Sequence, residues 1–242
     1  MEKKNDSYVV DIDYKKNKQF KYLLLSDVHF DSTKCDRKLL KKHLDEAKEI
    51  NAPIFIFGDF FDCMGGKWDK RSTKADIRPE YQTQTYFQDI ARDAAKFLAP
   101  YKELIYLLAD GNHETSIKVR HEFDLLDDLS DRLGGINRGK YSGFIRFRFH
   151  KGDSNRFSKI LYYTHGGGGN SPVTKGVIKT ARRQESIMSD IYVSGHVHTD
   201  FNMERTMVYL SDQGVVKQKA QLHLQLGTYK NDFMTGGWAD HK

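Results

Sequence analysis

The feature that most constrains this fold is a regular alternation of short apolar runs with amphipathic stretches in the first half of the chain. Three runs, at 22–25, 54–57 and 104–108, consist almost wholly of aliphatic and aromatic residues. Runs of four or five such residues are typical of strands buried on both faces. Each run is followed by a stretch of mixed polarity long enough for a helix, so the order predicts parallel pairing of the three strands.

Two helices are predicted between these strands. Apolar side chains recur at helical spacing from Leu39 to Ile50, and Asp36 stands where an N-cap is expected. A second helix fits residues from about 80 to 98 and is stopped by Pro100. The first half therefore predicts a β-α-β-α-β unit.

The second half is richer in strands. A hairpin is predicted from the apolar runs at 144–149 and 159–163, which flank a turn-like segment at 151–155. A helix is expected across 173–188, and further strands at 191–193, 207–210 and 221–226. No repeat or linker separates the halves. We therefore expect one domain spanning residues 1–242, with an α/β fold of layered sandwich type.

Composition limits the class of protein. Hydrophobic residues make up 38% and charged residues 30% of the chain, and no apolar run approaches the roughly 20 residues of a membrane span. The start, Met1 to Asp6, lacks an apolar signal segment, so export is not expected. Cys35 and Cys63 do not form a Cys-x-x-Cys pair, which argues against a disulfide framework or a cysteine zinc site. We expect a cytoplasmic protein that does not bind membranes.

Polar residues follow five of the strand-like runs. In open α/β sheets, ligands bind beyond the carboxyl ends of the strands, so these residues are candidates for a common site. They are Asp27-Val28-His29, Gly58-Asp59-Phe60-Phe61-Asp62, Gly111-Asn112-His113-Glu114, Thr164-His165-Gly166 and Gly195-His196-Val197-His198.

Each motif has an ordinary structural explanation when taken alone. Asp-x-His occurs by chance in loops, Gly-Asp-x-x-Asp suits a turn before a helix cap, and a single histidine such as His165 is usually a packed or surface residue. Five of the ten histidines nevertheless fall inside these five short motifs. Their joint occurrence in this order favours a shared metal site over five unrelated loops.

The ordered motifs resemble those of the calcineurin-like metallophosphoesterase superfamily, and the resemblance covers residues 27 to 198. It implies a four-layer α/β/β/α sandwich with metals at its rim. It also implies that His113 is the catalytic histidine and that Asp62 and Glu114 are its polar partners. The resemblance assigns the first metal to Asp27, His29, Asp59 and His198, and the second to Asp59, Asn112, His165 and His196, with Asp59 as the bridge.

These residue types suit a pair of cations. A carboxylate can bridge two ions with its two oxygens, and ions about 3.5–4 Å apart can clamp the oxygens of a phosphoryl group. We expect two divalent metal ions, with Mn²⁺ ahead of Fe, Zn²⁺ or Ni²⁺, because mixed nitrogen and oxygen donors without thiolate suit these ions better than Ca²⁺ or Mg²⁺. The expected reaction is attack of a metal-bridging hydroxide on a phosphate mono- or diester.

Four basic or aromatic residues are candidates for substrate contacts. Lys175 follows the glycine run 166–169 and would approach a phosphate, although this loop is equally explained by close packing beside the site. Arg182 and Arg183 share a predicted helix face, for which a solvated surface is the alternative. Trp68 lies in a basic insert and would stack on a base, unless the insert is an ordinary exposed loop.

The glycine loop, the basic helix and the C-terminal tail together resemble a little-described branch of the superfamily found in phages and mobile elements. That placement implies the cytoplasm of a bacterium or of a phage-infected cell. It implies no established substrate.

Three functions stay open at this point. The first is a hydrolase of phosphate esters, with a mild preference for nucleotide-type diesters because the net charge is +6. The second is a DNA or RNA nuclease similar to the SbcD-like branch of the family, so the partner is a nucleotide or a nucleic acid. The third is a non-catalytic scaffold that retains the fold, in which decayed ligand positions would be expected.

Overall fold

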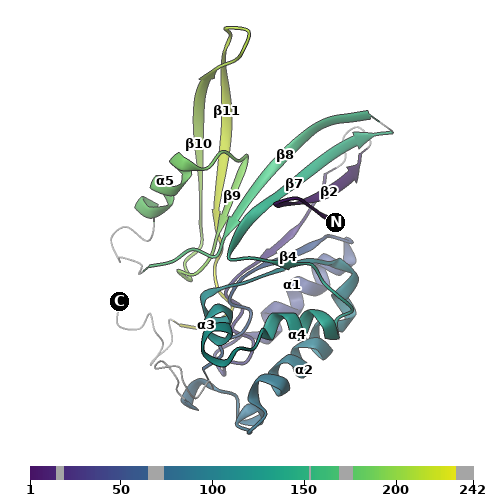
Figure 1. Ribbon diagram of the computed structural model, residues 1–242, viewed down its shortest axis with the longest axis vertical. Helices are drawn as coiled ribbons and strands as arrows, with labels where there is room; N and C mark the ends of the chain where they lie inside the picture. Colours follow the sequence, from purple (N-terminus) through teal and green to yellow (C-terminus); the bar gives the residue numbers. More distant parts are fainter. Residues whose placement is uncertain (15–18, 65–73, 153, 169–176, 233–242) are drawn as a thin grey trace.

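The computed structural model of the protein describes residues 1–14, 19–64, 74–152, 154–168 and 177–232 (Figure 1). The described chain forms a mixed α/β fold with two β-sheets and accompanying helices. Among the described residues, no helix is both long enough and apolar enough to cross a bilayer.

The smaller sheet confirms the predicted β-α-β-α-β unit. Its strands are all parallel and lie in chain order. The predicted strand bounds agree within one residue at each end. The strands are β3 (Leu23–Leu25), β4 (Ile54–Phe57), β5 (Ile105–Ala109) and β6 (Arg138–Gly139).

Helices cover one face of this smaller sheet (Figure 1). Asp36 caps the first of them, since its carboxylate accepts hydrogen bonds from the backbone N–H groups of Lys38 and Leu39 at 3.1 and 2.9 Å. The helices are α1 (Arg37–Glu49), α2 (Tyr86–Leu98), α3 (Asn112–His121) and α4 (Leu125–Arg132), with 3₁₀ turns η1 (Lys74–Asp76), η2 (Pro79–Tyr81) and η3 (Ala99–Leu104).

Helix α2 begins six residues later than the start predicted near residue 80, because η2 is a separate turn that begins at Pro79. The hydroxyls of Thr83 and Thr85 both donate to Asp89 in the first turn of α2. Such side-chain bonds compete with helical hydrogen bonding and favour a helix start.

The larger sheet has seven strands in the order β1-β2-β7-β8-β9-β11-β10. The predicted β7–β8 hairpin is confirmed as antiparallel, and β10 and β11 form a second hairpin. Helix α5 (Val177–Ser186) precedes β9 and falls within the helix predicted at 173–188, whose residues 173–176 lie outside the described chain. The strands are β1 (Glu2–Lys4), β2 (Ser7–Asp13), β7 (Ser142–Lys151), β8 (Ser154–Thr164), β9 (Ile191–Ser194), β10 (Phe201–Leu210) and β11 (Val216–Gln225).

Strands β1, β2 and β6 and helices α3 and α4 were not predicted from the sequence. Strands β1 and β6 are only three and two residues long, and α3 begins inside a polar motif. A signal for β2 was present, because Tyr8, Val10 and Ile12 alternate with other residues and point into the core.

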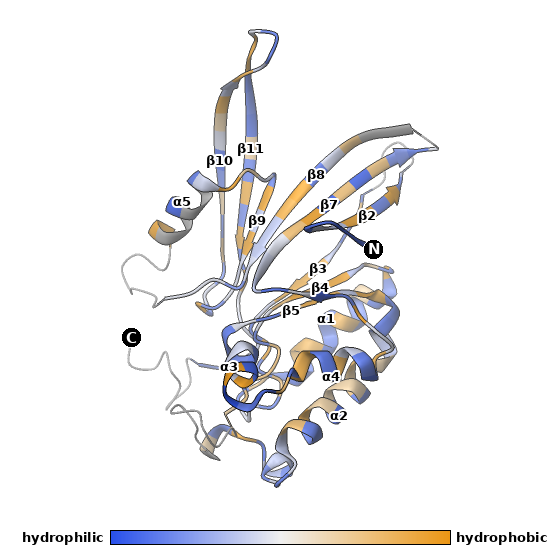
Figure 2. Ribbon diagram, viewed as in Figure 1, coloured by the Kyte–Doolittle hydropathy of each residue, from blue (hydrophilic) through white to orange (hydrophobic). Residues whose placement is uncertain are grey.

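The two sheets pack face to face through an aromatic and aliphatic layer. Figure 2 marks hydrophobic residues of β4, β7 and β8 in orange. Phe57 of β4 stacks on Tyr163 of β8 with ring centroids 4.8 Å apart, and Phe55 packs edge-on against Phe147 at 6.0 Å. Burying each such side chain contributes about 1.5–3 kcal/mol. This layer fixes the ends of β3, β4 and β5 relative to those of β8 and β9.

His223 of β11 is a fully buried histidine, and its described neighbours are aromatic rings and a hydroxyl. Its ring lies 4.6 Å from that of Tyr192, and its Nε2 lies 3.0 Å from the Ser194 hydroxyl. Burial lowers the pKa of His223 to about 4.

Acid should therefore destabilise the protein through His223. The unfolded chain takes up a proton near pH 6.5, whereas the folded protein does so only near pH 4, so stability is lost as the pH falls between these values. Going from about pH 7 to about pH 4.5 should cost roughly 2–3 kcal/mol through this group. Urea unfolding of wild type and His223→Gln at both pH values tests this, and equal pH dependence in the two proteins would refute it.

Candidate metal centre

The five polar motifs all lie at one rim of the two packed sheets. Three follow the carboxyl ends of β3, β4 and β5 in the smaller sheet, and two follow β8 and β9 in the larger one. Since β3, β4 and β5 run parallel, as do β8 and β9, each set of strands ends at a common edge. The face-to-face packing then brings the two edges together.

A first group of ligand atoms is formed by Asp27, His29 and His198. The Nε2 atoms of His29 and His198 are 3.1 Å apart, and His198 Nε2 is 3.3 Å from Asp27 Oδ1. Donors bound to one ion at about 2.1 Å stand roughly 3.0–3.4 Å from one another. The spacing therefore fits a common cation.

A second group is formed by Asp59, His165 and His196. His165 Nε2 lies 2.9 Å from Asp59 Oδ2 and 3.0 Å from the side-chain oxygen of Asn112. It also lies 4.0 Å from Asp27 Oδ1, so the two groups adjoin. The structure thus gathers all seven predicted ligands, while the bridging role of Asp59 stays a prediction.

The backbone is unusual at these positions. Among the described residues, nine that are not glycine have positive φ, and five of them are predicted ligands. Side chains other than glycine rarely adopt this conformation, and it persists only where the surroundings enforce it. Its concentration at one rim indicates a functional site. The five are Asp27, His29, Asp59, His196 and His198, with φ between 50° and 76°.

Two glycines allow the loops to approach each other. Gly58 has φ of +89°, and a Cβ on it would lie 2.5 Å from His165 Nδ1. A Cβ on Gly111 would lie 2.1 Å from Asp59 Oδ1 and 2.3 Å from the Asp59 backbone nitrogen, so the backbone itself would have to shift. Glycine is therefore required next to the carboxylate.

The donors fit a divalent cation. Asp27 is fully buried, and its Oδ2 accepts hydrogen bonds from the Ser26 hydroxyl at 2.6 Å and the His196 backbone N–H at 2.8 Å. Its other oxygen, Oδ1, faces the ring nitrogens of His198 and His165, at 3.3 and 4.0 Å. A buried carboxylate that faces imidazole nitrogens can share a cation with them.

The buried carboxylates also raise the pKa values of two histidines, His165 and His198. Burial lowers the pKa of His165, but Asp59 and Asp27 outweigh it and raise this pKa to about 10. Burial likewise opposes a rise at His198, whose pKa reaches about 9 through Asp232 and Asp27. A cation bound among these groups would compete with protons for the same nitrogens.

His113 lies beside both groups, with its Nε2 3.7 Å from Asp59 Oδ2. Its Nδ1 donates to the backbone carbonyl of Asp62, which fixes the ring. The carboxylate of Asp62 turns instead toward His29 Nδ1, at 2.7 Å. Asp62 therefore contacts His113 through its backbone and His29 through its side chain.

Glu114 holds the neighbouring loops in place. Its carboxylate accepts hydrogen bonds from the backbone N–H groups of Gly111, Asp59 and Phe61 at 3.0, 3.1 and 2.9 Å. Burial, with the negative charge of Asp59, raises the pKa of Glu114 to about 7. Glu114 is fully buried, and its described hydrogen bonds go to backbone rather than to His113.

Three residues of this region were not predicted. Asp31 accepts hydrogen bonds from the backbone N–H groups of Asp62 and Cys63, and Asp232 and Lys230 reach the site from the C-terminal end of the chain. Asp31 was four residues past Asp27 and could have been noticed. Nothing in the sequence marks Asp232, because it lies 34 residues beyond His198 in no motif.

The four predicted substrate contacts are not joined to the centre by any described interaction. Lys175 and Trp68 lie outside the described residues, as does the side chain of Arg183. Arg182 is exposed on α5.

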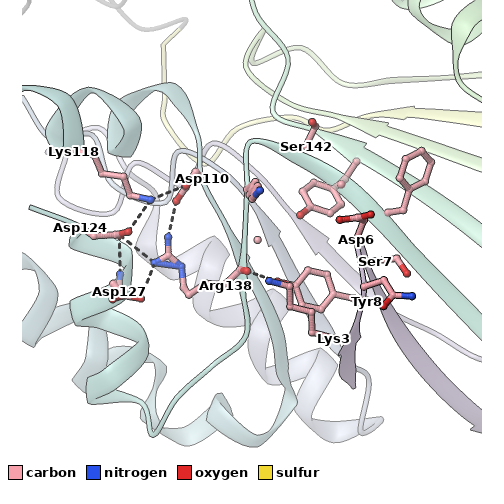
Figure 3. Close-up of a pocket in the computed structure, with 16 residues that line it drawn as sticks. Lys3, Asp6, Ser7, Tyr8, Asp110, Lys118, Asp124, Asp127, Arg138 and Ser142 are labelled. Atoms are coloured by element: carbon pink, nitrogen blue, oxygen red, sulfur yellow. Dashed lines mark hydrogen bonds and ion pairs between the residues drawn. The ribbon is translucent and has the colours of Figure 1, made fainter.

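A separate cavity of about 340 Å³ lies between the ends of β2, β6 and β7 and helices α3 and α4 (Figure 3). Its wall contains a closed ion network in which Lys118 and Arg138 each pair with Asp110 and Asp124 at 2.6–3.2 Å. These four residues come from α3, the start of α4, the end of β5 and β6, so their ion pairs tie the two helices to the two strands. The charges also neutralise one another within the network. None of the predicted ligands lines this cavity.

Comparison with known proteins adds little. No family model matches the chain, and no curated protein matches it. Among solved structures, the chain is similar to a conserved uncharacterised protein from Streptococcus pneumoniae TIGR4, described as a predicted phosphoesterase. The identity is 14%, the match covers 89% of this chain and 76% of that chain, and the TM-score is 0.31. A likeness at this level does not assign a family or a function.

Substituting Gly111 should disrupt the centre. In Gly111→Ala the new methyl group must displace the Asp59 carboxylate or its loop, since its nearest neighbours would be an Asp59 oxygen and the Asp59 backbone nitrogen. We expect weaker binding of Mn²⁺ by at least about tenfold, as for loss of a ligand-orienting contact. Equilibrium metal titration measures it. Gly167→Ala is the matched control, because the nearest atom to its Cβ would be 4.0 Å away, and equal affinities in the two variants would contradict the role of Gly111.

Proposed function

We propose that this protein is a dinuclear metal-dependent phosphoesterase of the calcineurin-like type. The proposal includes the four-layer α/β/β/α arrangement, a single domain over residues 1–242, and hydrolysis of phosphate mono- or diesters. Nucleotide-type diesters are the preferred substrates.

One observation carries this proposal. Seven side chains predicted as ligands from separate motifs converge from five strand ends into two adjoining groups of nitrogen and oxygen donors. The non-catalytic alternative expects some of these positions to be lost, and none is. A structural zinc site would favour cysteines, and both described cysteines are buried thiols outside the two groups.

The two groups would each hold one cation. Asp27, His29 and His198 would hold the first, and Asp59, Asn112, His165 and His196 the second; we propose Mn²⁺ ahead of Fe, Zn²⁺ or Ni²⁺. When bound, such ions lower the pKa of water and neutralise the charge that develops on phosphoryl oxygens.

His113 is placed to protonate the leaving group. With Nδ1 donating to the Asp62 carbonyl, its Nε2 is the nitrogen that faces the ligand cluster, 3.7 Å from Asp59 Oδ2. From there Nε2 can donate a proton to the leaving oxygen of an ester. The fixed ring supplies the orientation that this transfer needs.

A nuclease is the second candidate. Its support is the net charge of +6, which favours a polyanionic substrate. Charge alone does not distinguish a polynucleotide from a small nucleotide, so the substrate panel below includes both.

The test is turnover by the purified protein with Mn²⁺. The panel comprises a chromogenic phosphate monoester, the matching diester, cyclic nucleotides, and single- and double-stranded DNA. We expect hydrolysis of the small diesters and a loss of about 10²–10⁴-fold in His113→Ala. His150→Ala is the control, because His150 lies on β7 and pairs with Asp11 at 2.6 Å, away from the metal ligands.

The outcomes separate the candidates. DNA degradation with poor turnover of small diesters would favour the nuclease. Metal binding without hydrolysis of any substrate would favour the scaffold. Full activity in His113→Ala, with its metal content unchanged, would remove the role given to that histidine.

A further inference from the structure

The chain returns to the candidate centre after β11, through the segment Thr228–Asp232, here called the C-terminal strap. The Thr228 hydroxyl and the Tyr229 backbone N–H both donate to the carbonyl oxygen of Asp27, at 2.8 and 3.0 Å. Asn231 N–H donates to the Lys34 carbonyl at 3.0 Å. The strap is therefore fastened along the loop that carries Asp27 and His29.

Asp232 is the first of two strap residues that reach metal ligands. It is almost fully buried, and its carboxylate accepts a hydrogen bond from His198 Nδ1. The opposite ring nitrogen, Nε2, faces Asp27 Oδ1 at 3.3 Å. A carboxylate behind a ligating imidazole fixes its tautomer and orientation and makes its other nitrogen a better donor.

Lys230 is the second strap residue that reaches the candidate ligands. Its Nζ lies 2.8 Å from Asp62 Oδ1, and the same oxygen lies 2.7 Å from His29 Nδ1. The ammonium group thus holds the carboxylate that stands behind His29. Each histidine of the first group therefore has a carboxylate on its Nδ1 side. The strap supplies the carboxylate of Asp232, and through Lys230 it binds the carboxylate of Asp62.

The second group is supported differently. His165 Nδ1 lies 3.0 Å from the backbone carbonyl of Phe57, in the buried strand β4. This partner is neutral and belongs to the central sheet rather than to the strap. The support of the His165 ring therefore differs from those of the His29 and His198 rings in both charge and location.

We propose that the C-terminal strap positions the first metal site alone, with Asp232 and Lys230 as positioning residues, so that the two sites differ in affinity and only the first depends on strap docking. This inference rests on the proposed function. Loss of Asp232 leaves His198 able to ligate but free to turn, so affinity falls at one site and is retained at the other.

The experiment is equilibrium titration of metal-free protein with Mn²⁺. Binding is measured by calorimetry and by the electron paramagnetic resonance signal of free Mn²⁺. Wild type should bind two ions. In Asp232→Asn one of the two binding steps should weaken by about 10–100-fold while the other is unchanged. Lys230→Met should weaken the same step. The control is Asp212→Asn, an exposed change in the β10–β11 turn that should alter neither step.

Equal weakening of both steps, or of neither, in a variant whose circular dichroism matches wild type would overturn the strap proposal. A wild-type protein that binds no metal would overturn the proposed function first, and the two failures are thereby distinguished. Rescue of the weakened step in Asp232→Glu would support a positioning role.

Discussion

Asp27 and Asp59 are two carboxylates buried at the junction of the two sheets, and the surrounding structure is arranged to hold their charge. Removing such groups from water costs several kcal/mol each unless cations or hydrogen-bond donors replace the lost solvent. Ser26, the backbone of His196 and the backbone of His113 supply donors, and His165 and His198 supply nitrogens. Two buried carboxylates that face several imidazole nitrogens at one rim are the physical reason to expect metal ions.

The two sheets contribute different donors to this arrangement. The loops after β3, β4 and β5 bring all the oxygen ligands together with His29, while the loops after β8 and β9 bring only histidines. Neither sheet can form either group of ligands alone, because His198 completes the first and His165 and His196 complete the second. The Phe57–Tyr163 stack lies directly behind this junction. Formation of the two candidate ligand groups therefore depends on packing between the sheets.

The C-terminal strap adds a third contribution, and it makes the two groups unequal. The first group has charged supports from Asp232 and Asp62, whereas His165 of the second has a neutral backbone support. An ion in the first group would be held by stronger donors, and its site would depend on a segment more than 200 residues from Asp27 in sequence. Unequal sites allow one ion to serve mainly as structure while the other remains exchangeable.

The sequence by itself determined the strands of the smaller sheet, the β7–β8 hairpin and the seven ligand candidates, because apolar runs and the polar residues that end them are local signals. It also indicated the cap at Asp36, where side chain and backbone are neighbours. Only the tertiary structure decided that Asp62 turns its carboxylate to His29 rather than to His113, and that Glu114 binds three backbone N–H groups. It alone revealed Lys230 and Asp232 at the centre. These contacts depend on how distant segments pack, and no short pattern in the chain records that packing.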